Sequence, residues 1–301
     1  MSASPVTINR TTNDRAPVTV TALQEFKQLG QKLVMVTAYD YPSACVAEAA
    51  GVDMVLVGDS AATTVLGLDS TVPATTDELL MLSRAVRRGL RTPFLVSDLP
   101  FGSYEASDYD AIKTAQRFVK EAGADAVKIE RGGIMVDRAR AIVQTGIPVV
   151  GHLGLTPQTA TALGGLRAQG RQAGQAVQLV NDALALQDAG CCALVLEAIP
   201  AAVVEELMPL LSIPVIGIGA GSSTDGQVLV WHDLLGLLDG RTAKFVKQYA
   251  HGHQDAIAAI QNYADEVRTG VFPGREHTYT IPPDELQRFQ GSLARFQRAE
   301  A

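Results

Sequence analysis

The sequence has little of what a disulfide-stapled or membrane-bound chain needs. Its 301 residues include three cysteines, Cys45 and the adjacent pair Cys191 and Cys192. Three cysteines without metal-type spacing favour a reducing compartment, in which they serve as small buried side chains. No apolar run approaches the ~20 residues of a membrane span, and residues 1–18 lack the apolar segment of a secretory signal. We therefore expect a cytoplasmic protein without a membrane anchor.

The chain also lacks an excess of basic charge. It has 25 Lys and Arg against 32 Asp and Glu, which gives a formal net charge of −7 and a pI near 5.3. Proteins that bind nucleic acid or anionic membranes through their surface usually carry a basic patch, so neither partner is expected. The composition, 47% hydrophobic and 19% charged, is typical of a globular chain and excludes disorder of the whole protein.

What the sequence has instead is a repeated pattern of short apolar runs, each followed by a polar residue and a helical pattern. In one example, Met54–Val57 leads through Gly58 to Asp59 and Ser60. Such runs are typical of strands buried on both faces. The expected strands are 33–38, 54–57, 94–97, 126–129, 148–151, 193–196 and 214–218, with a further one within or just after 227–235.

Strands that alternate with helices through short connections predict a parallel sheet with right-handed crossovers. About eight such units in ~250 residues is the size of a (β/α)8 TIM barrel. A doubly wound open sheet is the alternative, but no Gly-x-Gly-x-x-Gly follows the first strand and the polar strand ends are not gathered at one switch point. We therefore predict an α/β TIM barrel over residues 21–280, a flexible tail at 1–20 and an extension at 281–301.

Polar side chains follow most of these strands and would meet at the carboxyl-terminal face of a barrel, where active sites lie. They are Asp40, Asp59 with Ser60, Asp98, Lys128 with Glu130, His152 and Glu197. Carboxylates gathered there repel one another unless a cation binds, and oxygen ligands suit Mg²⁺. Lys128 and Glu130 are two residues apart, so both face one side of their strand. The lysine either pairs with this carboxylate or binds a substrate carboxylate or enolate oxygen.

Each of these residues also has a structural explanation. Asp40 and Asp77 would more often be helix N-caps than ligands, and Glu197 could cap the next helix in the same way. His152 could be a hydrogen-bonded histidine of the core. The glycine-rich stretch 217–221 could hold a phosphate or form a tight turn. If all of these explanations were structural, however, polar residues would have to follow six strands at equivalent positions by coincidence.

Several longer motifs carry a resemblance to one family. They are VGDS at 57–60, GLDSTVPAT at 67–75, SDLPFGSY at 97–104, AVKIE at 126–130, GHLGLTPQ at 151–158, LEAIP at 196–200, IPVIGIGAG at 213–221, DGQVLVWHD at 225–233 and VFPGREH at 271–277. In this order the chain resembles ketopantoate hydroxymethyltransferase over residues 21–280. The resemblance implies a barrel of the phosphoenolpyruvate/pyruvate type and a homodecamer. It also implies transfer of a hydroxymethyl group from 5,10-methylenetetrahydrofolate to 3-methyl-2-oxobutanoate, in pantothenate biosynthesis.

The resemblance further implies a role for each strand end. These roles are Mg²⁺ ligation by Asp59, Asp98 and Glu130 (the last direct or through water), oxoacid binding by Asp59, Ser60, Asp98, Lys128 and His152, and base catalysis by Glu197. The chain departs from the family pattern nearby, with Ala61–Thr63 where many members have Leu-Gly-Met, Leu68 where His is frequent, Arg131 where Gly is usual and Ala168 where Val is usual.

Two other functions are alternatives. One is another Mg²⁺-dependent enolate enzyme of the same barrel type, a carbon–carbon lyase or a phosphonopyruvate-type hydrolase, which depends on a reactive cysteine or on arginines at the barrel mouth. The other is a barrel without catalysis that serves as a scaffold or a small-molecule binder. Cys45, Cys191 and Cys192 fall on helical or strand-leading positions, and a scaffold has no need of a carboxylate cluster. We therefore predict the transferase.

Overall fold

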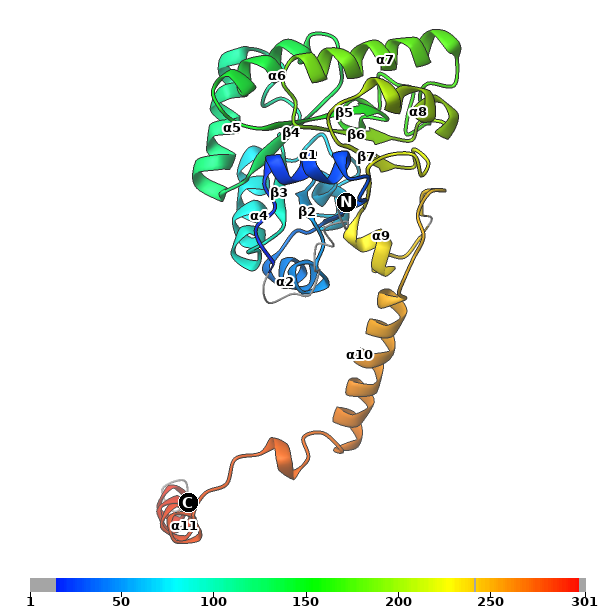
Figure 1. The fold of residues 1–301 in the computed structure, drawn as a ribbon. Helices are drawn as coiled ribbons and strands as arrows, with labels where there is room; N and C mark the ends of the chain where they lie inside the picture. Colours follow the sequence, from blue (N-terminus) through cyan, green and yellow to red (C-terminus); the bar gives the residue numbers. More distant parts are fainter. Residues whose placement is uncertain (1–14, 241, 298–301) are drawn as a thin grey trace, which may run out of the picture. The chain divides into compact units, whose positions relative to one another are not determined.

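The computed structural model describes residues 15–240 and 242–297. The chain divides into two compact units, and the boundary between them in the sequence lies between Ala250 and His251. The first unit is a closed barrel of parallel strands, so the predicted TIM barrel is confirmed (Figure 1). The strands are β1 (Leu33–Thr37), β2 (Met54–Val57), β3 (Phe94–Asp98), β4 (Ala126–Glu130), β5 (Val149–Gly154), β6 (Ala193–Glu197), β7 (Val215–Ile218) and β8 (Gly226–Leu229).

The helices of the first unit are α1 (Val20–Gln28), α2 (Tyr41–Ala50), α3 (Ala61–Thr64), α4 (Thr76–Gly89), α5 (Asp108–Ala122), α6 (Met135–Gln144), α7 (Ala173–Asp188), α8 (Ala201–Leu207) and α9 (Trp231–Leu235), with the 3-10 turns η1 (Pro157–Thr159) and η2 (Met208–Leu210). Helix α1 precedes β1 and packs against the interior of the barrel, and most of the other helices follow strands and pack against their outer faces (Figure 1). The predicted tail at 1–20 falls mainly on residues outside the described part of the chain. Val18 within it is buried.

Local sequence explains where the helices begin. The carboxylate of Asp40 accepts a hydrogen bond of 2.7 Å from the Ser43 N–H and forms the N-cap of α2, so the structural explanation of Asp40 is correct. Helix α4 begins at Thr75, which forms a capping box with Glu78. The prediction of Asp77 as an N-cap is therefore wrong. Asp77 lies in the first turn of α4, where its charge complements the helix dipole.

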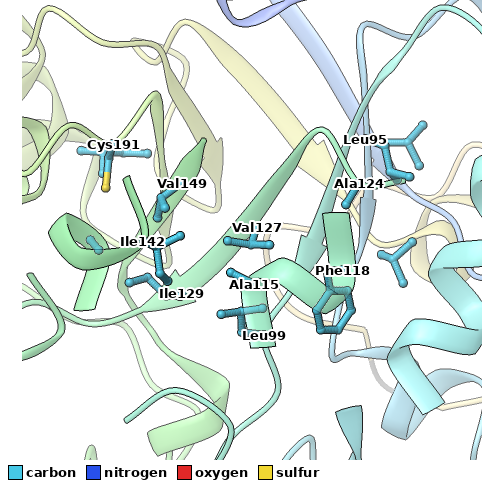
Figure 2. Close-up of a cluster of buried hydrophobic side chains, with 14 of the residues drawn as sticks. Leu95, Leu99, Ala115, Phe118, Ala124, Val127, Ile129, Ile142, Val149 and Cys191 are labelled. Carbon is cyan, nitrogen blue, oxygen red and sulfur yellow. The ribbon is translucent and has the colours of Figure 1, made fainter. Parts of the chain in front are cut away.

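One apolar layer lies outside the barrel strands and another lies inside the barrel. The side chains of each strand alternate between the two layers, and this alternation positions the site. The outer layer lies between strands and helices, and Figure 2 shows Val127 and Ile129 of β4 in it with Phe118 of α5. The intervening Lys128 and Glu130 must point into the barrel, because successive side chains of a strand alternate between its two faces. The inner layer fills the barrel and includes Leu23 and Phe26 of α1, Met54 of β2 and Phe94 of β3.

Aspartates satisfy strand N–H groups at the amino-terminal end of the barrel, Asp53 buried, Asp225 half-buried and Asp125 exposed. In three places an aspartate just before one strand accepts a hydrogen bond from the beginning of the preceding strand. The pairs are Asp53 with the Val34 N–H at 2.7 Å, Asp125 with the Leu95 N–H at 2.8 Å and Asp225 with the Val215 N–H at 2.8 Å. Asp53 is fully buried and forms an ion pair with Arg15. Arg15 also donates to the carbonyl oxygens of Gly51 and Val52.

The second unit contains α10 (Gly252–Thr269), the 3-10 turn η3 (Arg275–His277) and α11 (Pro283–Gln297). None of the described side chains of α10 is buried. The compact unit that contains the barrel ends at Ala250. The predicted catalytic domain over residues 21–280 stays a prediction. Across the described residues, no helix is both long enough and apolar enough to cross a membrane.

Candidate active site

A cavity of about 160 Å³ lies at the carboxyl-terminal end of the barrel. The strand-end residues that line it are Asp59, Ser60, Asp98, Lys128, Glu130, His152 and Glu197. All of the predicted site residues are thus brought together, apart from Asp40, which caps α2. Pockets for drug-sized ligands measure roughly 300–1,000 Å³, so this cavity fits a small molecule with few heavy atoms.

The register of the strands explains why these side chains meet. Asp98 of β3 lies opposite Lys128 of β4, and Glu130 of β4 lies opposite His152 of β5. Glu197 ends β6, the next strand around the barrel. Residues directly opposite each other on neighbouring strands are close enough for their side chains to interact. The polar residues therefore form a row across four adjacent strands.

The row is a continuous series of charged contacts. Lys128 Nζ lies 2.9 Å from Asp98 Oδ1 and 3.9 Å from Glu130 Oε1. His152 Nδ1 lies 3.3 Å from Lys128 Nζ and 3.3 Å from Glu130 Oε1. On its other side, His152 Nε2 lies 3.2 Å from Oε2 of Glu197. Each group in the row thus has a charged or ionisable neighbour, and the row ends at Glu197.

Asp59 and Ser60 reach the cavity from the turn after β2. The Asp59 N–H donates a hydrogen bond of 3.0 Å to Asp98 Oδ2, and the Ser60 hydroxyl lies 2.8 Å from the hydroxyl of Tyr39. Gly58 makes this turn possible, because a Cβ at that position would lie 2.7 Å from Ser60 Oγ. The glycine that ends the β2 run is therefore required by the close approach of Ser60.

Burial and charge shift the pKa values of these groups. Burial, together with the carboxylates of Glu130 and Asp98, raises the pKa of Asp59 to about 7. Burial also raises the pKa of Asp98, against the opposing effect of Lys128. Burial and the Lys128 ammonium act to lower the pKa of His152, but its contacts with Glu130 and Glu197 outweigh them and raise it to about 9. The carboxylates are held together at an electrostatic cost.

Several buried acceptors in the cavity lack a well-aligned hydrogen bond. They are Asp59 Oδ2, Asp98 Oδ1 and Glu130 Oε1. The ring nitrogen His152 Nε2 also lacks a well-aligned hydrogen bond. Buried polar atoms without hydrogen bonds are uncommon in folded proteins. Within the described part of the chain, no three His, Cys, Asp or Glu side chains are arranged to hold a metal ion by themselves. Asp59 Oδ2 and Glu130 Oε1 are thus buried acceptors without a hydrogen bond, whereas Asp98 Oδ1 faces the Lys128 ammonium at 2.9 Å.

Comparison with known proteins identifies the family. A family model of ketopantoate hydroxymethyltransferase matches residues 17–275. The chain belongs to this family. The 3-methyl-2-oxobutanoate hydroxymethyltransferase of Moorella thermoacetica is 52% identical over 88% of this chain and 98% of its own length. The protein of the same name from Carboxydothermus hydrogenoformans is 49% identical over 90% of this chain and 98% of its own length.

Solved structures at low sequence identity share the fold of this family member. Phosphoenolpyruvate phosphomutase from Streptomyces platensis subsp. rosaceus matches with a TM-score of 0.56 at 17% identity, over 94% of this chain and 98% of its own. The 2,3-dimethylmalate lyase, a member of the phosphoenolpyruvate mutase/isocitrate lyase superfamily, matches with a TM-score of 0.55 at 17% identity, over 93% and 98%. These likenesses confirm the expected barrel type.

Two residues of the family motifs that received no role from the sequence form a second layer behind Glu130. The Tyr104 hydroxyl donates a hydrogen bond of 2.7 Å to Gln158 Oε1 and accepts one of 3.2 Å from the Glu130 N–H. The Gln158 N–H donates to Glu130 Oε2 at 3.1 Å. Tyr104 and Gln158 end the motifs SDLPFGSY and GHLGLTPQ. The sequence signal that could have identified both residues is a polar side chain at the end of each motif.

The glycine-rich stretch 217–221 of the family motif is explained by packing. A Cβ on Gly219 would lie 2.5 Å from the ring of Phe245, which also lines the cavity. At Gly217 a Cβ would meet Thr224 Oγ1 at 2.8 Å, and at Gly221 it would meet Ala201 at 2.7 Å. Protein side chains thus fill the space beside these glycines, and this supports the turn alternative over a phosphate site.

The backbone turns sharply after two of the site carboxylates. Arg131, directly after Glu130, has φ 80°, and Ala198, directly after Glu197, has φ 50°. A left-handed backbone costs a non-glycine residue roughly 1–2 kcal/mol. Glycine, which the resemblance implies at this position, adopts this conformation without strain. The Arg131 N–H donates to the His152 carbonyl at 2.8 Å, which helps to hold the turn.

Proposed function

We propose that this protein transfers a hydroxymethyl group from 5,10-methylenetetrahydrofolate to 3-methyl-2-oxobutanoate, giving 2-dehydropantoate (ketopantoate) for pantothenate and coenzyme A biosynthesis. The observation that carries the proposal is the row Asp98–Lys128–Glu130–His152–Glu197 along one small cavity, in a chain of this family. Removal of a proton from C3 of the oxoacid needs a base, and the enolate that results needs positive charge beside its oxygen. The row supplies both.

Mg²⁺ fits the acceptors in the cavity. This ion keeps several waters and takes one or two protein carboxylates, which agrees with a site that has free carboxylate oxygens but no enclosing set of three ligands among its described residues. Asp59 and Asp98 would hold the ion, and Glu130 would hold it directly or through water. When bound, Mg²⁺ would draw electron density from the keto group and make the C3 proton more acidic.

The chain's own residues perform the remaining steps of the proposal. Lys128 and Ser60 bind the oxoacid, with Lys128 as the cation for its carboxylate. Glu197 takes the proton from C3, and His152, 3.2 Å from Glu197, orients its carboxylate. C3 then forms a bond to the methylene carbon of the folate, the bond from that carbon to the folate nitrogen breaks, and water supplies the hydroxyl group. The folate nitrogen takes up the proton, and tetrahydrofolate leaves with the hydroxymethyl product.

We also propose that the protein assembles as a homo-oligomer, a decamer in keeping with the family. Exposed apolar side chains on α10 support self-association. Ile257, Ile260 and Val267 recur at helical spacing and are 45%, 66% and 46% exposed. Within the first unit, Val34 on the outer face of β1 is 43% exposed. Apolar surface of this kind is typical of subunit interfaces.

Observations on the cavity disfavour the alternative enzymes. No cysteine and no arginine is among the described residues that line it. Cys191 and Cys192 are buried beside β6, and burial raises the pKa of both thiols to about 12. A lyase with a reactive cysteine and a hydrolase with phosphonate-binding arginines therefore lack their expected groups here.

Proton exchange tests the proposal without the folate. The protein is incubated with 3-methyl-2-oxobutanoate and Mg²⁺ in D₂O, and deuterium at C3 is followed by proton NMR. We expect exchange that requires Mg²⁺ and stops when the ion is chelated. A scaffold or a phosphonate enzyme would give no exchange, and that result would overturn the proposed function.

A further inference from the structure

We propose that Tyr104 and Gln158 are positioning residues that hold the Glu130 carboxylate with one oxygen bound by protein and the other turned into the cavity. This inference rests on the proposed function, because it gives Glu130 its role toward the metal ion and the oxoacid. Neither residue lines the cavity. Tyr104 acts through Glu130 and Gln158, and Gln158 acts through Glu130 and through a side-chain contact with the Asp59 carboxylate.

The hydrogen bonds among the three residues close a ring. The Glu130 N–H donates to the Tyr104 hydroxyl, the Tyr104 hydroxyl donates to Gln158 Oε1, and the Gln158 N–H donates to Glu130 Oε2. The three residues come from different parts of the chain, namely the loop after β3, the end of β4 and the turn η1. The ring therefore fixes the end of β4 against two loops.

Gln158 is held at both ends of its side-chain amide. Its Oε1 accepts from Tyr104, and its Nε2 donates to the Leu99 carbonyl at 2.9 Å. The side chain uses the donor and the acceptor of its amide in a fully buried site, where Tyr104 and Gln158 are 2% and 3% exposed. Because buried polar groups cost free energy when they lose their partners, this arrangement has little freedom to relax.

The ring divides the two oxygens of Glu130. Oε2 is satisfied by the Gln158 N–H, whereas Oε1 has no well-aligned hydrogen bond and lies 3.3 Å from His152 Nδ1 and 3.9 Å from Lys128 Nζ. A carboxylate held in this way presents a single free oxygen at a fixed position. Residues that orient a metal-binding carboxylate through hydrogen bonds typically contribute 10–100-fold to metal affinity or activity.

The test compares Tyr104→Phe and Gln158→Met with a matched control. Each variant keeps the approximate volume of the buried side chain. Tyr104→Phe removes both hydrogen bonds of the hydroxyl, and Gln158→Met removes the two hydrogen bonds of the side-chain amide, which anchor the backbone N–H that donates to Glu130 Oε2. The control is Ser83→Ala, because the Ser83 hydroxyl makes a buried hydrogen bond of 2.9 Å to Ser97 and does not line the cavity. Tyr104→Phe and Gln158→Met each lose two buried hydrogen bonds and Ser83→Ala loses one, so all three should lower the melting temperature, Ser83→Ala by the least.

The metal separates positioning from stability. In calorimetric titrations with 3-methyl-2-oxobutanoate present, we expect the Kd for Mg²⁺ to rise about tenfold or more in Tyr104→Phe and Gln158→Met and to stay unchanged in Ser83→Ala. The Mg²⁺ concentration for half-maximal C3 exchange should rise by the same factor, with the rate at saturating Mg²⁺ within about twofold of the original. Because the residues act as a unit, the double variant should cost little more than either single one.

Crystal structures of the metal-free proteins provide the second readout. We expect Glu130 Oε2 to leave the Gln158 N–H in Gln158→Met, where both side-chain anchors are lost. An unmoved Glu130 together with an unchanged Kd for Mg²⁺ would overturn the positioning role. If the unmodified protein shows no Mg²⁺-dependent exchange, the proposed function fails, and the position of Glu130 in the variant still decides whether Tyr104 and Gln158 hold this carboxylate.

Discussion

His152 Nε2 lies 3.2 Å from Oε2 of Glu197, while Nδ1 of the same ring lies 3.3 Å from Oε1 of Glu130. A single imidazole thus stands between the carboxylate proposed for the metal side of the cavity and the carboxylate proposed as the base. An imidazole between two carboxylates fixes the orientation of both, since each ring nitrogen faces one partner. The row of charged side chains therefore runs from Lys128, the cation, to Glu197, the proposed base.

Removal of the cation that faces Asp53 should destabilise the barrel strongly. Arg15→Met leaves a fully buried carboxylate without its ion pair, and breaking a buried pair on one side costs about 3–5 kcal/mol. The control is Arg117→Met, whose exposed pairs with Asp77 and Glu121 are worth about 0–1 kcal/mol. Urea unfolding measures both. Equal losses in the two variants would show that burial of Asp53 has no energetic consequence.

Stability should fall in alkaline solution because of the buried thiols. Burial raises the pKa of Cys191 and Cys192 to about 12, whereas a thiol in the unfolded chain ionises near pH ~8.5. Between these values the unfolded chain binds fewer protons than the folded one. The free energy of unfolding therefore decreases as the pH rises, by up to about 1.4 kcal/mol per pH unit for each thiol.

Unfolding in denaturant under reducing conditions at pH 8, 9 and 10 measures this slope. The Cys191→Ala variant should show a shallower slope, because one of the two thiol protons is gone, while His152, whose pKa is raised to about 9, contributes equally to both proteins. A slope that is the same in Cys191→Ala and in the original protein would contradict the assignment to the thiols.

Glycine at residue 131 should stabilise the protein. Arg131→Gly removes a left-handed strain of roughly 1–2 kcal/mol and adds about 0.5–1 kcal/mol of chain entropy cost, so a net gain of about 0.5–1 kcal/mol is expected. Arg140→Gly, the same substitution within α6, should instead destabilise by about 1 kcal/mol. Chemical unfolding of both variants decides the sign, and a loss of stability in Arg131→Gly would refute the strain.

The exposed face of α10 should control assembly. Ile260 is 66% exposed on this face, so Ile260→Asp should place a charge in a subunit contact and reduce the particle mass measured by multi-angle light scattering. Asn262→Asp adds the same charge to a different face of the same helix and should leave the mass unchanged. A monomeric mass for the unmodified protein would contradict self-association.

The sequence predicts the strand ends well because two simple rules act together. Period-two burial places Lys128 and Glu130 inside the barrel, and the common direction of parallel strands brings their neighbours to one face. The same pattern does not separate Asp40 from Asp59, since each follows a buried strand. What distinguishes them is the local sequence, because Pro42 at the start of α2 marks Asp40 as a helix cap.

The remaining features depend on contacts that periodicity does not contain. The ring of Tyr104, Glu130 and Gln158 closes between loops, whose conformations follow from the packed barrel and not from the order of apolar residues. The boundary at Ala250 depends on where the apolar face of α10 packs. The helix itself is evident from its spacing, but its partner is not.

Deuterium exchange in Glu197→Gln tests most directly whether Glu197 is the base that takes the proton from C3. The substitution keeps the shape of the side chain and removes its ability to accept a proton, while Asp59, Asp98 and Lys128 are unchanged. With C3-deuterated 3-methyl-2-oxobutanoate and Mg²⁺ in H₂O, we expect Glu197→Gln to bind the oxoacid with a Kd within about threefold of the original, because a neutral isostere away from the metal side removes little binding. We expect the oxoacid to retain its C3 deuterium in the presence of this variant. Loss of the deuteron at the rate of the unmodified protein would contradict this expectation.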